Sequence, residues 1–479
     1  MKAYKTLLFF LSIILILVLI SFSFPEEGIP FVGRRLYFPS ITEVLTKEEA
    51  SSTTEKMDEL EEQIRLQRDS LAMAYQDSLS FYTNFFNTNP ARIHLPDNNW
   101  DYFDNLFQDL ELSKEKKEVI HILHYGDSQI EGDRITGSVR QRLQEKFGGR
   151  GPGLLPAVQI IPSAAVAQTA SGNIARYIVS GSHVNRTSHR RYGSLGQVGH
   201  MVGEGSISIS SRNWKNTFEN VKEFSKIRLF VGKTNNTFKA SLVAPDLERI
   251  TKTVEDTAAV HVLSWNLENP IKKFTLKMAG SAEIYGIAVD GEYGVAMDNI
   301  PFRGSSGIFF NTIDSTVMVS MFQQLNTRLI ILEFGGNMMP VMKSDKLVAE
   351  YKTKMSAQIA YLRRVCPEAK IILIGPADMS TKVKGKLQTY PYLKETAEAL
   401  KEAALENDAA FWNMFEVMGG ENSMKNWVNS RPSLAAPDYI HFTPRGADKI
   451  ADMFYESLMM YYDYYCFQRE IKENETKDE

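Results

Sequence analysis

Cysteine is almost absent from this sequence, and the common cofactor motifs are missing. Only Cys366 and Cys466 occur in 479 residues, a spacing that matches no metal-binding motif and does not by itself predict a disulfide. No P-loop, dinucleotide-binding fingerprint or zinc-ligand spacing is present. We therefore expect a protein that uses neither a cofactor nor a metal.

An excess of positive charge is also lacking. Lys and Arg number 54 against 58 Asp and Glu, so the formal net charge is −4. A chain without a basic field has little to hold a phosphate backbone, and we expect no nucleic acid as a partner. The 43% hydrophobic and 23% charged residues are typical of a globular protein, and 479 residues suffice for two domains with additions.

The one long hydrophobic run lies at the N-terminus. It extends from Leu7 to Phe24 and follows Lys2 and Lys5. Such a run is long enough to span a bilayer, and the flanking lysines favour a cytoplasmic N-terminus. A cleaved signal peptide is the alternative, but a small-x-small cleavage site is absent. We predict an uncleaved anchor over residues 1–25, with the rest of the chain outside the cytoplasm.

Residues 26–90 are predicted to form a helical stalk or linker. From Thr46 to about Phe86 the sequence is polar, rich in Glu and helix-favouring. A heptad-like seam of apolar residues is interrupted by polar ones, so we favour a solvated stalk over self-association through this seam. The seam consists of Met57, Leu60, Ile64, Leu71 and Ala74.

Two separate stretches, 91–164 and 299–466, alternate between predicted buried strands and helices. This alternation indicates a parallel sheet covered by helices on both faces. Residues 467–479 form a charged C-terminal tail. The predicted strands are 119–123, 329–334 and 371–374, and the predicted helices are 345–365, 392–407 and 443–462.

The region between them, residues 165–298, has a different pattern. Short runs that alternate between apolar and polar residues, such as 206–210, 227–231 and 274–278, are separated by turn-rich pieces. A helix-length amphipathic pattern is absent there. Short strands at this spacing predict an antiparallel β-sandwich, so we expect an α/β fold interrupted by an all-β domain.

Three residues, one in the first third of the chain and two near its C-terminal end, carry the clearest chemistry. Ser128 follows the apolar run 119–123, where a strand-to-helix turn can expose a hydroxyl beside backbone N–H groups. Asp438 and His441 lie three residues apart, ahead of the last predicted helix. A serine hydroxyl is a weak nucleophile that needs an imidazole base, and the base needs an orienting carboxylate. Each piece alone also fits a loop, a turn or a helix start, but their combination predicts a Ser-His-Asp triad.

Attack on an ester also requires donors for the oxyanion that forms. The Ser128 N–H is one candidate. Asn337 follows a predicted buried strand at the end where open α/β sheets bind ligands, and Gly304 offers a further backbone N–H. The alternatives are loop capping for Asn337 and a turn with positive φ for Gly304.

These segments, taken in order, resemble the four sequence blocks of the SGNH (GDSL-type) hydrolases. The blocks are Gly126-Asp127-Ser128, Gly304, Gly335-Gly336-Asn337 and Asp438-Tyr439-Ile440-His441. The resemblance covers about residues 118–160 and 300–465. It implies a flavodoxin-like three-layer α/β/α fold with Ser128 as nucleophile, His441 as base, Asp438 as its partner, and Gly304 and Asn337 as oxyanion donors.

Two positions depart from this family pattern. Gln129 stands where the family name has Leu, a change that we expect not to touch the chemistry. Met338 follows Asn337 where Asp is often found, so support for the Asn337 side chain must come from elsewhere.

The layout, with a β domain inserted after the nucleophile block, is similar to that of envelope peptidoglycan O-acetylesterases, whose insert resembles a carbohydrate-binding module. It implies a serine esterase that removes acyl groups, mainly acetyl, from a cell-envelope or extracellular polysaccharide. The catalytic part would lie on the periplasmic side of a bacterial inner membrane. The alternatives are an O-acetyltransferase served by a membrane acyl-donor partner, and a non-catalytic glycan-binding protein with a vestigial site.

Other polar and aromatic residues are weaker candidates. Arg134 could contact a sugar or an acidic group, but we favour a solvated or salt-bridged helix face for it and for Gln129, Glu131 and Asp133. We expect His121 and His124 to be satisfied core or rim histidines, and favour a solvated loop over a metal or anion patch for His183, His189 and His200 among Arg186, Arg190 and Arg191. The β-domain aromatics could stack on sugars, although each is more typical of core: Trp214, Phe238, Trp265 and Tyr285.

Overall fold

The computed structural model describes residues 75–478, with short gaps at 182–183, 215–216, 235–236 and 255–257. It also describes a few short pieces nearer the N-terminus, at 9, 11–13, 18–19, 29–31, 34–36, 58–59 and 61–62. Most of the predicted anchor, the apolar seam of the stalk and His183 therefore lie outside the described residues. Among the helices that are described, none is both long and apolar enough to cross a membrane.

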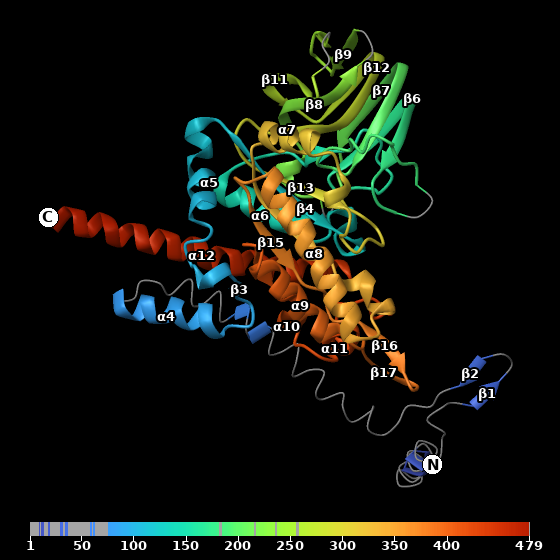
Figure 1. The fold of residues 1–479 in the computed structure, drawn as a ribbon, viewed down its shortest axis with the longest axis vertical. Helices are drawn as coiled ribbons and strands as arrows, with labels where there is room; N and C mark the ends of the chain where they lie inside the picture. Colours follow the sequence, from blue (N-terminus) through green and yellow to red (C-terminus); the bar gives the residue numbers. More distant parts are fainter. Residues whose placement is uncertain are drawn as a thin grey trace.

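A six-stranded sheet forms the centre of the molecule (Figure 1). Its order is β13-β4-β14-β15-β18-β3, with β3 antiparallel at the edge. Numbered along the chain, the five parallel strands have the order 2-1-3-4-5, which is the flavodoxin-like arrangement. The strands are β3 (Ile93–His94), β4 (Val119–Gly126), β13 (Gly294–Pro301), β14 (Thr327–Glu333), β15 (Lys370–Ile374) and β18 (Ala410–Trp412).

Helices cover both faces of this sheet because its strands are apolar on both sides. In β14, for example, Leu329 and Ile331 face one buried core, whereas Ile330 and Leu332 face the other. The first core packs against α4 (Tyr75–Thr88), α5 (Asp104–Lys116), α6 (Thr136–Phe147) and α12 (Pro444–Asp478). The second packs against α7 (Ser315–Leu325), α8 (Asp345–Val365) and α9 (Leu393–Leu405).

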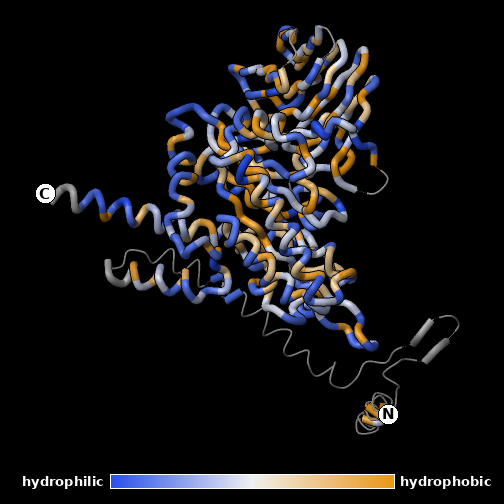
Figure 2. Tube along the Cα trace, viewed as in Figure 1, coloured by the Kyte–Doolittle hydropathy of each residue, from blue (hydrophilic) through white to orange (hydrophobic). Residues whose placement is uncertain are grey.

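The mixed α/β fold with a parallel sheet is confirmed, and α8 coincides with its predicted range. The last helix differs from the prediction, because α12 continues to Asp478 and so includes most of the segment expected to be a charged tail. In Figure 2 hydrophobic segments gather at the centre of the molecule, whereas the projecting end of α12 is mostly hydrophilic. Because this end does not pack against a core, its sequence lacks the apolar pattern of a core helix.

Eight further strands form an all-antiparallel β domain, drawn at the top of Figure 1, and two small hairpins pair β1 (Ile29–Phe31) with β2 (Arg34–Leu36) and β16 (Ser380–Val383) with β17 (Lys386–Thr389). The apolar side chains of the β domain enclose a third core of their own. Its strands are β5 (Gly153–Leu155), β6 (Val166–Ile178), β7 (Gln197–Ser211), β8 (Phe224–Thr234), β9 (Phe238–Val243), β10 (Ile250–Val254), β11 (His261–Ile271) and β12 (Lys273–Asp290).

The strand pairing differs in one respect from two separate sandwich sheets. The 18-residue strand β12 pairs with β7 along one edge and with β9 and then β8 along the other. Register shifts at Ala282/Ile284 and Ile284/Gly286 lie where β12 passes along β8. Such irregularities bend a strand, so one long strand serves both halves of the domain and joins them into a single sheet.

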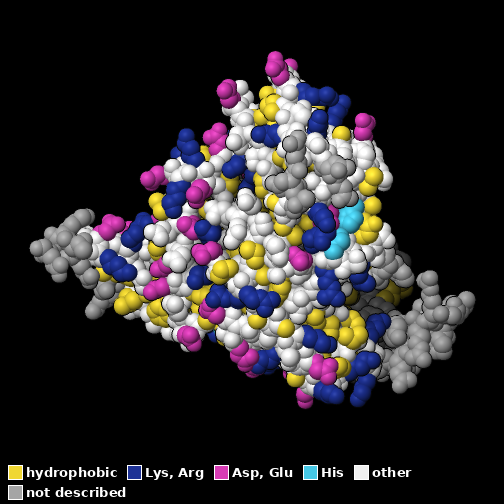
Figure 3. Space-filling model, turned by 45° about the horizontal axis from the view of Figure 1, so that its top comes forward, with side chains coloured by type: hydrophobic (Ala, Val, Ile, Leu, Met, Phe, Trp, Pro, Cys, Tyr) yellow, Lys and Arg dark blue, Asp and Glu magenta, His cyan; other side chains and the backbone are white. Residues whose placement is uncertain are grey.

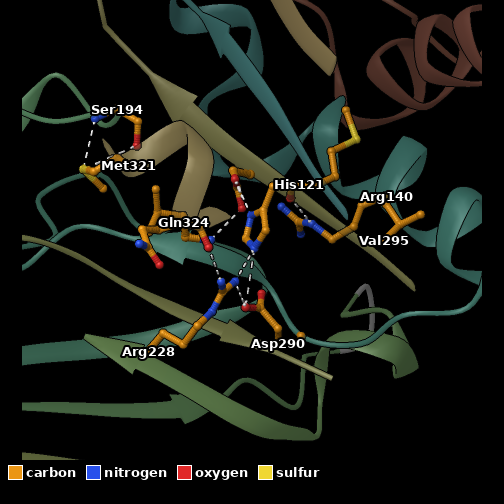
Figure 4. Close-up of polar contacts among 12 residues, drawn as sticks. His121, Arg140, Ser194, Arg228, Asp290, Val295, Met321 and Gln324 are labelled. Carbon is orange, nitrogen blue, oxygen red and sulfur yellow. Dashed lines mark hydrogen bonds and ion pairs between the residues drawn. The ribbon is translucent and has the colours of Figure 1, made fainter. Parts of the chain in front are cut away.

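A buried polar network joins the β domain to the parallel sheet (Figure 4). His121 on β4 contacts Asp298 of β13 through Nδ1 at 2.9 Å, and its Nε2 lies 2.7 Å from Nη2 of Arg228 on β8. Arg228 also donates to Asp290 at 2.9 Å. Burial alone would lower the pKa of His121, but the carboxylates of Asp298 and Asp290 raise it to about 9. These charges are withdrawn from water, and their contacts link the β domain to the parallel sheet.

Candidate active site

Ser128 lies where the chain leaves the parallel sheet. Strand β4 ends at Gly126, and Asp127 then caps a 3-10 turn, η2 (Ser128–Asp133), by accepting a hydrogen bond from the Gln129 N–H at 2.9 Å. The helix expected after the serine turn does not follow it directly but begins at Thr136, because the chain kinks inside the turn at Glu131 and Gly132. The neighbours of β4 are β13 and β14, so Ser128 occupies the point where the strand order reverses, at which open α/β sheets bind ligands.

His441 reaches Ser128 from the other end of the chain. Its Nε2 lies 2.9 Å from the Ser128 Oγ, across a sequence separation of 313 residues. Its Nδ1 lies 2.7 Å from the Asp438 Oδ2. An Nδ1–H donated to this carboxylate leaves Nε2 with a lone pair that can accept the Ser128 hydroxyl proton.

Asp438 is built to remain ionised. Its Oδ1 accepts the backbone N–H groups of Ile440 and His441, both at 3.0 Å, while Oδ2 faces the imidazole. Partial burial would raise the pKa of Asp438, but these hydrogen bonds outweigh it and lower the pKa below its usual value. The carboxylate therefore stays charged at neutral pH and can orient the ring.

Gln129 connects the two halves of this arrangement through backbone contacts. Its Nε2 donates to the Ile440 carbonyl at 2.7 Å, and its Oε1 accepts from the Phe442 N–H at 3.4 Å. These are the residues on either side of His441. The side-chain amide thus holds the histidine loop against the serine turn, a role for which the sequence offers no signal because the partners are more than 300 residues apart.

Asn337 lies across the pocket from the triad. It belongs to the turn η5 (Gly336–Val341), which follows β14, and its Nδ2 donates to the Asp127 Oδ2 at 2.7 Å and to the Ser305 carbonyl at 3.1 Å. Asp127 therefore supplies the support that Met338 cannot. Donation to an oxyanion would require Nδ2 to give up or share one of these bonds, of which the longer one to Ser305 is the weaker.

Asp127 is a strongly perturbed carboxyl group beside the nucleophile. Burial raises its pKa to about 7, with the Glu333 charge adding to the rise and the hydrogen bonds from Gln129 and Asn337 opposing it. Perturbed carboxyls are common at functional sites. The sequence pattern gives Asp127 no role of its own, because that role depends on partners from two other segments.

Gly304 is not brought into the same pocket. It is exposed in a turn with φ of +72°, consistent with the turn alternative, and lies outside the residues that line the cavity beside Ser128. Its neighbour Arg303 is held by two hydrogen bonds to Glu131, both of 2.6 Å. The Ser305 carbonyl, rather than a Gly304 N–H, approaches Asn337.

The cavity beside Ser128 and His441 has a volume of about 170 Å³. Polar groups occupy the end near the nucleophile, and apolar side chains occupy the remainder. This volume is below the roughly 300–1,000 Å³ of drug-sized ligand sites. The apolar lining comprises Phe334, Pro340, Pro376, Ala377, Met379, Met414 and Ile440.

Of the charged residues after Ser128, Glu131 and Asp133 form salt bridges, whereas Arg134 bonds backbone carbonyl groups. Arg134 donates to the carbonyl groups of Ser128 and Glu131, and Asp133 pairs with Arg140 at 2.8 Å. His124 is buried between Glu333 and Thr136, at 3.1 and 2.9 Å. Phe238, Trp265 and Tyr285 are buried, whereas Trp214 is half exposed and stacks on Arg212.

The described part of the predicted histidine patch forms a cluster at the surface of the β domain. His189 and His200 lie close to Glu283, a set that resembles metal ligands. The Glu283 Oε1 already contacts Arg191 and His189, at 2.6 and 3.3 Å, and Oε2 accepts from Arg191 and Tyr285, at 3.0 and 2.5 Å. Both Glu283 oxygens are thus engaged, chiefly by Arg191, whereas His200 Nε2 is buried without a hydrogen-bond partner among the described residues. His200 lies on strand β7 and not in the loop that the sequence predicts. The histidines visible in Figure 3 lie beside Lys or Arg side chains.

Comparison with known proteins places the chain among ester hydrolases. Residues 287–449 match the model of the GDSL-like lipase/acylhydrolase family. That range includes Asn337, Asp438 and His441 but not Ser128, which the β domain separates from the rest. A search of curated proteins found no match.

Solved structures of two esterases match this chain to different extents. A peptidoglycan O-acetylesterase matches with a TM-score of 0.59 and 22% identity, over 75% of this chain and 95% of the other. A family two carbohydrate esterase from Cellvibrio japonicus matches with a TM-score of 0.24 and 9% identity, over 62% and 99% of the two chains. The first of these likenesses shows a shared fold over most of both chains.

Proposed function

Since this chain carries a domain of the GDSL-like lipase/acylhydrolase family and is a carboxylic-ester hydrolase, we propose that it removes O-acetyl groups from a cell-envelope or extracellular polysaccharide such as peptidoglycan. The observation that carries the proposal is the hydrogen-bonded chain from Ser128 through His441 to Asp438, at the mouth of a small cavity. A nucleophile, a base and an orienting acid are the groups that acyl transfer to serine requires.

Each of these three side chains takes a different part in the proposed reaction. Ser128 Oγ attacks the ester carbonyl carbon as His441 Nε2 takes the hydroxyl proton, and Asp438 stabilises the imidazolium that forms. The carbonyl C–O bond to the sugar then breaks, and the sugar hydroxyl leaves with the proton from His441. Water attacks the acetyl-serine with the same base, releasing acetate and restoring the serine.

The oxyanion would be met by the Ser128 N–H and the Asn337 amide. Asp127 fixes the position of Asn337, whose Nδ2 would turn its second N–H from the Ser305 carbonyl to the oxyanion. Gly304 is left out of this mechanism because it does not line the cavity.

Two features support a short acyl group on a glycan. The 170 Å³ cavity suits acetyl better than a long acyl chain. The fold is shared with a solved peptidoglycan O-acetylesterase along most of both chains. We place the enzyme at the outer side of a bacterial inner membrane, anchored by residues 1–25, because of the hydrophobic run there.

The test is acetate release from O-acetylated peptidoglycan by the purified chain, compared with its Ser128→Ala variant. We expect acetate from the wild type and none above background from the variant, with an unchanged melting temperature. Equal release by the two proteins would contradict the proposal. Acetyl groups appearing on an added glycan acceptor, without free acetate, would favour the O-acetyltransferase alternative and its membrane donor partner.

A further inference from the structure

A second cavity, of about 60 Å³, lies between the β domain and the parallel sheet on the β13 side of the nucleophile. Pro301 at the end of β13 lies opposite Gly126, two residues before Ser128, so the floor of this cavity adjoins the serine turn. The opposite wall is provided by β6 and β7 through Arg176 and Gln197. A sugar whose acetyl ester is attacked by Ser128 would therefore have neighbouring substituents directed towards this space.

Arg176 stands out in this cavity because its charge has no counter-ion. Its Nε donates to the Gln197 Oε1 at 2.7 Å, and it forms no ion pair among the residues that the structure describes. Burial lowers its pKa, which reflects the cost of withdrawing a cation from water without a partner. Both Nη groups remain for a ligand, and they form the planar fork that matches a carboxylate.

Three other arginines near this cavity or on the same domain are each paired with a carboxylate. Arg140 in the same cavity pairs with Asp133 at 2.8 Å, and Arg303 at the adjoining turn is bound by Glu131. On the same domain, Arg191 is bound by Glu283. Arg176 alone among these four lacks a carboxylate.

The rest of the lining favours an acidic sugar over a free inorganic anion. With Asp133 and Arg140 neutralising one another, Arg176 leaves the cavity with one net positive charge. Side-chain amides supply hydrogen-bonding groups for hydroxyls, and apolar residues, including Ile160 at 65% exposure, supply a surface for a pyranose ring. The amide residues are Gln159, Gln197 and Asn299, and the apolar ones include Leu195, Ile161 and Ile300.

We propose that Arg176 binds a carboxylate carried by the glycan whose acetyl ester is cleaved at Ser128, and so selects acidic polysaccharides. This inference rests on the proposed esterase function and narrows its substrate class. The carboxylate could belong to a lactyl ether or peptide, as in peptidoglycan, or to a uronic acid. The chemistry recognised is the same, and the substrates below distinguish these sources.

The experiment compares the wild type, Arg176→Gln and a matched control, Lys277→Gln. Lys277 is an exposed cation on β12 that does not line the cavity, so its loss changes the domain's net charge equally. Three substrates are used: an O-acetylated peptidoglycan fragment, the same fragment with its carboxylates converted to amides, and acetylated polygalacturonate. Hydrolysis of p-nitrophenyl acetate reports the chemical step alone.

We expect Arg176→Gln to lower kcat/KM on the acidic peptidoglycan fragment by about 10- to 100-fold, the range typical of a charge-assisted hydrogen bond. Activity on the amidated fragment and on p-nitrophenyl acetate should stay within about twofold, and Lys277→Gln should behave as wild type. An equal loss on polygalacturonate would show that any nearby carboxylate suffices, whereas a loss confined to peptidoglycan would assign the lactyl or peptide source.

Two results would overturn the inference while leaving the esterase function intact. One is an equal loss on acidic and amidated fragments, which would indicate a structural role for Arg176. The other is no loss on either. A wild type that hydrolyses p-nitrophenyl acetate but releases no acetate from any glycan would instead refute the proposed function, and the inference with it.

Discussion

Two histidines in this molecule have similar partners but different surroundings. His441 lies between Asp438 and a hydroxyl, with its side chain 34% exposed. His121 lies between two carboxylates and Arg228, with no exposure. Both rings contact a carboxylate through Nδ1, at 2.7 and 2.9 Å.

The difference shows that the partner of the second ring nitrogen decides the role. At His441, Nε2 faces a proton donor beside an open cavity, so the ring can take up a proton and return it. At His121, Nε2 faces Asp290 and Arg228 in a sealed junction. A protonated ring there cannot accept from Arg228, but the two carboxylates outweigh this contact and keep the pKa raised.

We expect the largest difference between the two histidines in their effect on ester hydrolysis. His441→Ala should lower kcat for p-nitrophenyl acetate by about 10⁴-fold or more, because the serine loses its base. Its melting temperature should stay close to the wild-type value, since the side chain is partly exposed. A variant retaining a tenth of the activity would remove His441 from the mechanism.

Replacing the orienting acid should have a smaller effect. Asp438→Asn should lower kcat by about 10³-fold, because the amide favours the wrong imidazole tautomer. Asp438 is 46% exposed, so water can substitute for part of its role. The measurement is steady-state hydrolysis with Asp345→Asn, an exposed helix residue, as the charge control. An Asp438→Asn enzyme as active as that control would contradict the triad.

At the junction we expect a change in stability instead. His121→Leu should lower the free energy of unfolding by about 3–5 kcal/mol, because it leaves Asp290 and Asp298 buried with one cation fewer. His441→Ala is the matched control and should cost below about 1 kcal/mol in the same urea titration. Equal losses in the two variants would erase the distinction between these histidines.

The same network should make stability depend on pH. The folded-state pKa of His121 is raised from 6.5 to about 9, so the native state holds this proton more tightly than the unfolded chain. Its contribution is complete below about pH 6.5 and is lost as the pH rises through 9. Urea titrations between pH 6 and 10 should show this loss in the wild type and not in His121→Leu.

Gln129 offers the smallest and most specific test of how the active histidine is held. Gln129→Leu should lower kcat by about tenfold with little change in KM, because the hydrogen bonds to Ile440 and Phe442 that position the His441 loop are lost. Gln129→Glu keeps the acceptor for Phe442 but sets a carboxylate oxygen against the Ile440 carbonyl, so it should lose at least as much. Unchanged kcat in the leucine variant would show that the His441 loop keeps its position without Gln129.

Much of the fold follows from local patterns that the sequence displays. The apolar runs at 329–334 and 371–374 became β14 and β15, and the amphipathic pattern at 345–365 became α8. The short alternating runs likewise became antiparallel strands. Each of these patterns reflects a face that must be buried, which short-range spacing reveals.

The features that were missed depend on contacts between distant segments. The sequence could not show that Gln129 reaches Ile440, that Asp127 holds Asn337, or that the Ser305 carbonyl beside Gly304 contacts Asn337. Nor could it show that β12 bends to serve both halves of the β domain. Such pairings are set by tertiary packing, which spacing along one chain does not encode.

The most direct test of the account is covalent labelling with a fluorophosphonate probe, followed by peptide mapping. The Ser128–His441 contact of 2.9 Å predicts a single modified serine, Ser128, and loss of labelling in His441→Ala. A probe attached to another residue, or an unlabelled Ser128 in protein that still releases acetate, would contradict the claim that these two side chains form the catalytic centre.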